Sequence, residues 1–142
     1  MCQVNIGEVY LHADYYQNPD GNNEKFLVIL ASCPAGDYIY KLLTSRENGR
    51  PRNPACYHGD PYPSYFLDTL GGIMRRESWV DLRAADDYDS YHFRSRVDDG
   101  IITLIGQIPH DELLALLECV AGSDDVTLRQ ERSIRDALAE QR

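Results

Sequence analysis

The chain has 142 residues, of which 43% are hydrophobic and 26% charged, and its formal net charge is −9. This length and balance indicate a single globular domain with one substantial core. The sequence has no stretch of about 20 apolar residues, which a membrane span needs, and its first residues lack the basic and apolar regions of a secretion signal. We therefore expect a cytoplasmic protein with no membrane partner.

The charge is divided unevenly along the chain. Residues 46–96 carry eight arginines against eight acidic residues, whereas residues 1–45 have a net charge of −3 and residues 97–142 a net charge of −6. An acidic surface opposes nonspecific nucleic-acid binding, because that binding depends on the neutralisation of phosphates. An anionic ligand is therefore expected at the middle third of the chain.

Hydrophobic patterns predict a protein built mainly of short strands. The apolar run at residues 26–30 indicates a strand covered on both faces, and residues 38–43 form its return strand after a turn at residues 34–37. Residues 91–96 alternate aromatic or small side chains with basic ones, so a half-exposed strand with three basic side chains on one face is expected. The acidic residues 86–89 are predicted as a turn. Further strands are expected at residues 6–12, 65–67, 78–82 and 101–108.

Two helices are predicted at the end of the chain. Apolar residues at helical spacing, starting at Leu113, form one stripe of a helix that ends at Gly122. Thr127 and Gln130 have the spacing of a capping box and open a second helix, which extends to about residue 140. Because this last helix has few apolar residues, we expect it to be largely solvated or docked on a partner.

Short strands followed by helices are typical of a small β-barrel with helices on its outside. The predicted fold class is mainly β with C-terminal α: a partly open barrel of five to seven strands with one or two helices packed outside. Residues 1–122 would hold the barrel and the first C-terminal helix. Residues 123–142 would add a helix that is part of the same domain or a docking element.

The four cysteines, Cys2, Cys33, Cys56 and Cys119, show no paired spacing. This favours reduced thiols over a disulfide framework or a zinc site. Cys56 and His58 alone are only half of a metal site, because no second pair with ligand spacing follows. Motifs for dinucleotides, for ATP phosphates and for catalytic zinc are also absent, so no metal and no cofactor is predicted.

One candidate site lies at the end of the predicted return strand. Thr44, Ser45 and Arg46 could hold and polarise a phosphate, with Arg50 or Arg52 as an added cation, because a guanidinium binds phosphate through two hydrogen bonds. The alternative is a strand end whose hydroxyls cap a loop, with solvated arginines.

A second candidate site lies within residues 55–65, where the composition is unusual. His58 could serve as general acid or base near neutral pH with Asp60 orienting it, and Tyr57 and the tyrosines that follow it could stack on bases. The alternative is a loop held by two prolines, with tyrosines that pack on the barrel.

Several segments, in their order along the chain, resemble the PemK/MazF family of toxin-like proteins. Lys25 stands where the family usually has an arginine, although Phe26 replaces the proline that follows it there. Thr44 and Ser45 match the Thr-Ser pair at the end of the third strand of the family, in its active-site groove. The other matching segments are Gly-Glu-Val-Tyr at residues 7–10, the strand at residues 25–31 and Ile-Gly-Gln-Ile at residues 105–108.

The resemblance implies an SH3-like barrel that dimerises and cuts single-stranded RNA without metal. The leading hypothesis is therefore a toxin-type, metal-free endoribonuclease or a degenerate relative that only binds RNA, with an antitoxin, another protein or a second copy as partner. In either case Lys25, Arg50, Arg52, Tyr57 and Asp60 would contact the substrate. The alternatives are a non-catalytic interaction module that docks through its acidic C-terminal helix, and an acidic inhibitor that mimics nucleic acid.

Overall fold

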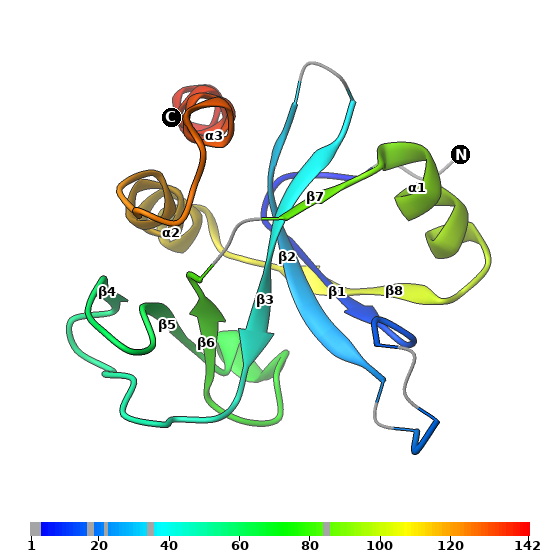
Figure 1. Cartoon of the computed structure of the whole chain (residues 1–142), viewed down its shortest axis with the longest axis horizontal. Helices are drawn as coiled ribbons and strands as arrows, with labels where there is room; N and C mark the ends of the chain where they lie inside the picture. Colours follow the sequence, from blue (N-terminus) through cyan, green and yellow to red (C-terminus); the bar gives the residue numbers. More distant parts are fainter. Residues whose placement is uncertain (1–3, 17–18, 22, 34–35, 84–85) are drawn as a thin grey trace.

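The computed structural model describes residues 4–16, 19–21, 23–33, 36–83 and 86–142. Within these residues the chain forms eight strands, three α-helices and one short 3-10 helix (Figure 1). The strands are β1 (Glu8–His12), β2 (Lys25–Ser32), β3 (Tyr38–Thr44), β4 (Cys56–Tyr57), β5 (Ser64–Asp68), β6 (Ser78–Asp81), β7 (Asp86–Tyr88) and β8 (Ile102–Gln107). The helices are η1 (Leu70–Gly72), α1 (Ser90–Asp98), α2 (His110–Ala121) and α3 (Leu128–Gln141).

The strands form one antiparallel sheet with the order β4-β5-β6-β3-β2-β1-β8. One edge of β3 is divided between two partners: its first residues pair with β7, and Leu43 and Thr44 pair with β6. Among the described residues, β4 and β8 each pair with one neighbour, so the sheet stays open.

This arrangement confirms a β-rich fold with C-terminal helices and corrects the predicted barrel of five to seven strands. The described residues contain eight strands in an open sheet and three α-helices instead of one or two. The sheet does not close into a barrel. Strands β6, β5 and β4 extend it from the end of β3 in a direction away from β8, so its two edge strands do not meet (Figure 1).

The apolar run in β2 supplies two separate cores. Val28 and Leu30 pack into a larger, mainly aliphatic core with α2 and α3, whereas Leu27 and Ile29 belong to a second core that is rich in tyrosine and includes Phe93 of α1. Successive side chains of a strand point to opposite faces, so one strand serves both cores. The prediction of a strand covered on both faces is confirmed.

Helix α1 occupies residues that the sequence predicted as a strand. The carboxylate of Asp89 caps the helix, because its Oδ1 accepts a hydrogen bond from the backbone N–H of His92 at 3.0 Å. Phe93 is fully buried in the second core. The predicted basic stripe is also wrong, since Arg94 lies about 200° around the helix from His92.

The acidic residues 86–89, predicted as a turn, instead form β7 and the cap of α1. Tyr88 joins the second core, where its ring centroid lies 5.1 Å from that of Phe93. Asp87 forms an ion pair with Arg129 of α3. A half-buried aromatic side chain and a partner for the charge thus stabilise a strand that composition alone argues against.

Helices α2 and α3 lie side by side and cover the larger core (Figure 1). Both helices were predicted, and the capping box of Thr127 and Gln130 is present. One face of α3 is buried in its own chain, since Ile134, Ala137 and Leu138 pack against α2 and β2, and the opposite face is exposed. That this helix docks on a partner stays a prediction. In the described part of the chain, no helix is long and apolar enough to cross a membrane.

Candidate functional site

A cavity of about 610 Å³ opens at the start of β2 and the end of β3. Four residues from the sequence prediction share it: Lys25, Thr44, Ser45 and Arg46. The full lining comes from the adjoining ends of β1, β2, β3 and β8 and from the segment before β6: Leu11, Glu24, Lys25, Phe26, Leu43, Thr44, Ser45, Arg46, Ile73, Met74, Arg75, Arg76, Ser78 and Ile105.

The lining is basic on a strongly acidic protein. Lys25, Arg46, Arg75 and Arg76 face a single acidic side chain, Glu24, so the lining carries a net charge of +3 on a chain of net charge −9. The three guanidinium groups are exposed, and none of them forms an ion pair with any residue that the structure describes. Like charges without partners repel one another, so an anion would be stabilised here.

Lys25 lies half-buried at the first position of β2. Its Nζ donates a hydrogen bond to the backbone carbonyl of Leu43 at 3.4 Å. Burial lowers the pKa of its ammonium group, and the guanidinium groups of Arg46 and Arg50 lower this pKa further, against the opposing charge of Asp81. A larger share of this amine is therefore neutral near physiological pH than in an exposed lysine.

Two hydroxyl groups stand beside the basic side chains. Thr44 ends β3, and its Oγ1 accepts a hydrogen bond from the backbone N–H of Arg46 at 3.2 Å. This bond turns the chain at the strand end, as the alternative interpretation of a capped loop expected. It leaves the hydroxyl hydrogen of Thr44 and the exposed side chain of Ser45 available as donors to a ligand.

Arg75 and Arg76 also line the cavity, although the site predicted from the sequence did not include them. They reach it because the chain turns back between β5 and β6, where Asp68, Leu70 and the two glycines of η1 all have positive φ. A glycine in β8, Gly106, lets this segment approach, since a Cβ there would lie 2.7 Å from Cδ1 of Ile73. The Gly-Gly pair followed by two arginines was the only available signal.

Two of the predicted arginines serve the protein itself. Arg50 is buried, donates a hydrogen bond from Nη1 to the carbonyl of Arg46 at 2.7 Å, and lies 4.6 Å from the ring centroid of Tyr62. Arg52 is paired with Glu47 at 2.8 Å and with Glu77 at 2.9 Å. Neither residue lines the cavity.

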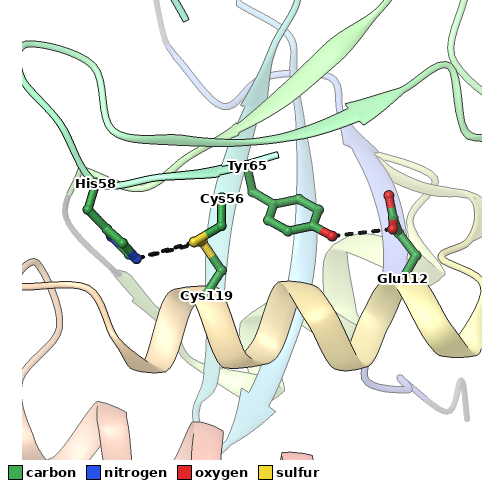
Figure 2. Close-up of a disulfide and its surroundings, with 5 residues drawn as sticks. All are labelled: Cys56, His58, Tyr65, Glu112 and Cys119. Atoms are coloured by element: carbon green, nitrogen blue, oxygen red, sulfur yellow. Dashed lines mark hydrogen bonds between the residues drawn. A yellow bond between two sulfur atoms is a disulfide. The ribbon is translucent and has the colours of Figure 1, made fainter. Parts of the chain in front are cut away.

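The other predicted residues lie at the end of β4 and on the loop that follows it, next to α2. Tyr57 donates a hydrogen bond to the backbone carbonyl of Asp60 at 3.3 Å. His58 points toward a disulfide between Cys56 and Cys119, with Nε2 at 3.2 Å from the sulfur of Cys56 (Figure 2). The structure does not bring these residues to the cavity.

The disulfide corrects the prediction that the cysteines are reduced thiols. Cys56 and Cys119 are 63 residues apart, and the packing of β4 against α2 brings them together, which no spacing pattern could show. Cys33 is a free, buried thiol, and Cys2 lies outside the described residues.

Comparison of this chain with models of known protein families, with curated proteins and with solved structures gives no match. The function of the cavity is therefore inferred from its own geometry and chemistry.

Proposed function

We propose that the cavity binds the phosphate backbone of single-stranded RNA, and that the protein is an RNA-binding relative of the PemK/MazF family. The observation that carries the proposal is the gathering of Lys25, Arg46, Arg75 and Arg76 at one cavity without carboxylate partners for the arginines among the described residues. Arginines that form ion pairs elsewhere on the chain are already neutralised by carboxylates, so they attract an anion less strongly.

The remaining lining suits a nucleotide. Guanidinium groups bind phosphate through two hydrogen bonds, and the hydroxyls of Thr44 and Ser45 can donate further ones. The apolar part of the wall includes the half-buried ring of Phe26, on which a base could stack. A single strand can place an unstacked nucleotide in such a cavity, whereas a duplex keeps its bases paired and stacked.

The resemblance supports the same assignment. Thr44 and Ser45 match the Thr-Ser pair in the active-site groove of the family, and Lys25 stands where the family usually has an arginine. All three line one cavity, at the adjoining ends of β2 and β3. Membership of the family, an SH3-like fold and dimerisation stay predictions.

Metal-free cleavage is a second candidate, which the lowered pKa of Lys25 favours. Its neutral amine could accept the proton of a ribose 2′-hydroxyl, whose oxygen then bonds to phosphorus as the 5′-oxygen leaves. The leaving oxygen takes a proton from water or from the ammonium group so formed, and a 2′,3′-cyclic phosphate remains. Arg46 would stabilise the charge that develops on the phosphate oxygens. His58 is not part of this proposal, because it contacts the disulfide instead.

The test is fluorescence anisotropy of a labelled, mixed-sequence single-stranded RNA with wild-type protein in EDTA, over a series of salt concentrations. The Arg75→Gln/Arg76→Gln double variant should bind more weakly, and its slope of log K against log salt should be smaller by about 0.7 for each lost phosphate contact. The Arg132→Gln/Arg135→Gln variant, which loses the same charge from α3, is the matched control. Equal weakening by both double variants, or no binding by folded wild type, would overturn the proposal and favour a protein partner.

The same reactions, separated on a denaturing gel, test cleavage. Cleavage by Lys25 predicts discrete products with cyclic phosphate ends, formed in EDTA and lost in Lys25→Met. RNA that is bound but stays intact would retire the cleavage candidate and leave the binding proposal standing.

A further inference from the structure

Three side chains with metal-ligand atoms meet where the loop after β4 contacts α2. The sulfur atoms of Cys56 and Cys119 and Nε2 of His58 all lie within 4.8 Å of one another. Nε2 is 3.2 Å from the sulfur of Cys56 and 3.9 Å from that of Cys119. Figure 2 shows the imidazole directed at the sulfur pair from the loop side.

The structure restricts the loop next to the histidine. A Cβ on Gly59 would lie 2.2 Å from the hydroxyl of Tyr57, so only glycine lets the tyrosine ring lie across the loop just after His58. Cys119 is buried in the last turn of α2, whereas Cys56 is half-buried and His58 is exposed. The group is therefore fixed on its inner side and accessible to solvent on its outer side.

We propose that Cys56, His58 and Cys119 form a redox-controlled binding site for a thiophilic divalent metal ion of the Zn²⁺ class. In the oxidised protein the disulfide sulfurs carry no hydrogen, so His58 donates from Nε2–H and no metal site exists. A dithiol reductant breaks the bond: it supplies two electrons and two protons, yields two cysteine thiols and becomes a disulfide itself. Metal binding then releases one proton from each thiol, and the neutral imidazole binds through Nε2.

The geometry of the reduced site suits such an ion. A tetrahedral zinc ion with Zn–S of about 2.3 Å and Zn–N of about 2.0 Å keeps its sulfur and nitrogen ligands about 3.5 Å apart. The two nitrogen–sulfur distances, 3.2 and 3.9 Å, lie on either side of this value. The sulfurs need only move apart to nonbonded spacing, and Cys56 can do so because β4 is a two-residue edge strand. Water would take the fourth position.

The position of Cys119 on its helix also favours a cation. The last turn of a helix carries partial negative charge from carbonyl groups without intrahelical partners, and a positive ion near it is stabilised. The metal would link β4 to α2 in the reduced protein, as the disulfide does in the oxidised protein. The same contact would then persist in reducing and oxidising compartments, with different chemistry in each.

The experiment titrates Co²⁺ into the full chain after reduction with a phosphine reductant under anaerobic conditions. Reduced wild type should show thiolate-to-cobalt charge-transfer absorption and the visible bands of a tetrahedral ion, saturating at one ion per chain, and Zn²⁺ should remove both. Oxidised wild type should show neither. His58→Ala should bind Co²⁺ about tenfold more weakly or worse, with altered visible bands.

Two matched controls separate this site from chance binding. His110→Ala removes an exposed histidine at the opposite end of α2, and Cys33→Ala removes the free buried thiol, so both variants should titrate like wild type. The cysteine ligands are tested with Cys56→Ser, which should lose the charge-transfer band. This position is half-buried, whereas Cys119→Ser would disturb a buried one. Reduced, folded wild type without that absorption, or His58→Ala that binds like wild type, would overturn the proposal.

Discussion

The two ends of one sheet face are built in opposite ways. On β2, Phe26, Val28 and Leu30 point to the same side. Val28 and Leu30 are buried in the core that α2 and α3 cover, whereas Phe26 lines the open cavity. The end that holds Val28 and Leu30, which we call the closed end, is apolar and is cross-linked by the disulfide between β4 and α2. The open end is surrounded by positive charge.

The difference indicates which end stabilises the fold and which end can bind a ligand. At the closed end side chains contact one another, as when the hydroxyl of Tyr65 donates to Glu112 of α2 at 3.2 Å (Figure 2). Five other exposed arginines are paired, such as Arg83 with Asp81 at 2.8 Å, whereas Arg132 of α3 forms no ion pair with any described residue. The arginines at the cavity break this pattern at a cost in mutual repulsion and without a gain in packing. We infer that a ligand supplies the missing negative charge.

The largest effect is expected at the closed end, on reduction of the disulfide. The bond closes a loop between residues 63 apart, and its loss should lower the free energy of unfolding by about 4 kcal/mol. Urea unfolding with and without reductant measures this. Cys56→Ser is the control, since its stability should not respond to reductant. If closed and open ends are independent, the RNA affinity of reduced protein stays that of oxidised protein.

The next effect concerns Lys41, which lies between the two ends on β3. It is 1% exposed, and its Nζ donates to the carbonyl of Leu82 at 2.8 Å. Burial lowers the pKa of Lys41 to about 8, although nearby carboxylates, those of Asp125, Asp81 and Asp86, oppose the shift. Between this value and the ordinary 10.5, the unfolded chain binds more protons than the folded chain, so stability rises with pH.

Between pH 8 and pH 10.5 the free energy of unfolding should rise by about 3 kcal/mol in wild type, and this rise should be absent in Lys41→Met. At pH 7 the variant should be as stable as wild type or more so, because it removes a buried charge. Thermal unfolding from pH 7 to pH 9.5 makes the comparison before tyrosines titrate in the unfolded chain. Parallel pH profiles for both proteins would show that Lys41 is not the titrating group.

Sequence patterns revealed the closed end better than the open end. The strand at β2 and the leucine stripe of α2 are strongly periodic, so burial fixes them without knowledge of their neighbours. Helix α1 was missed because its alternation imitates a strand, and only the cap at Asp89 signalled a helix. The acidic β7 depends on a ring contact with Phe93 of the helix that follows it and on an ion pair with Arg129, which is 42 residues from Asp87.

The candidate site was predictable only in part for the same reason. Lys25 and Thr44 lie on adjacent strands of a predicted hairpin, so their meeting follows from strand pairing. Arg75 and Arg76 reach the cavity through a turn of positive φ and the close approach at Gly106, which are properties of the folded backbone. His58 was separated from Thr44 because β4 pairs with β5 at the edge of the sheet, next to α2.

A smaller effect is expected where the arginine-bearing segment meets β8. In Gly106→Ala the new methyl group would push against Ile73, at a cost of about 1–2 kcal/mol in the free energy of unfolding. It should also move residues 73–76 outward and weaken RNA binding, which anisotropy at fixed salt measures. Gly21→Ala, at a glycine with open space around it, is the control for the loss of a glycine, although its positive φ adds strain. Unchanged RNA affinity in folded Gly106→Ala would separate this segment from the site.

The smallest effect on stability should come from the cavity arginines themselves. Arg75→Gln/Arg76→Gln removes two exposed charges without ion-pair partners among the described residues, so the free energy of unfolding should change by less than about 0.5 kcal/mol, or rise as repulsion falls. Arg52→Gln breaks contacts with Glu47 and Glu77 and should lower stability instead. Urea unfolding of both variants against wild type decides the point. If Arg75→Gln/Arg76→Gln lowers the free energy of unfolding more than Arg52→Gln does, these arginines stabilise the fold. Their lack of ion-pair partners would then no longer argue for a ligand.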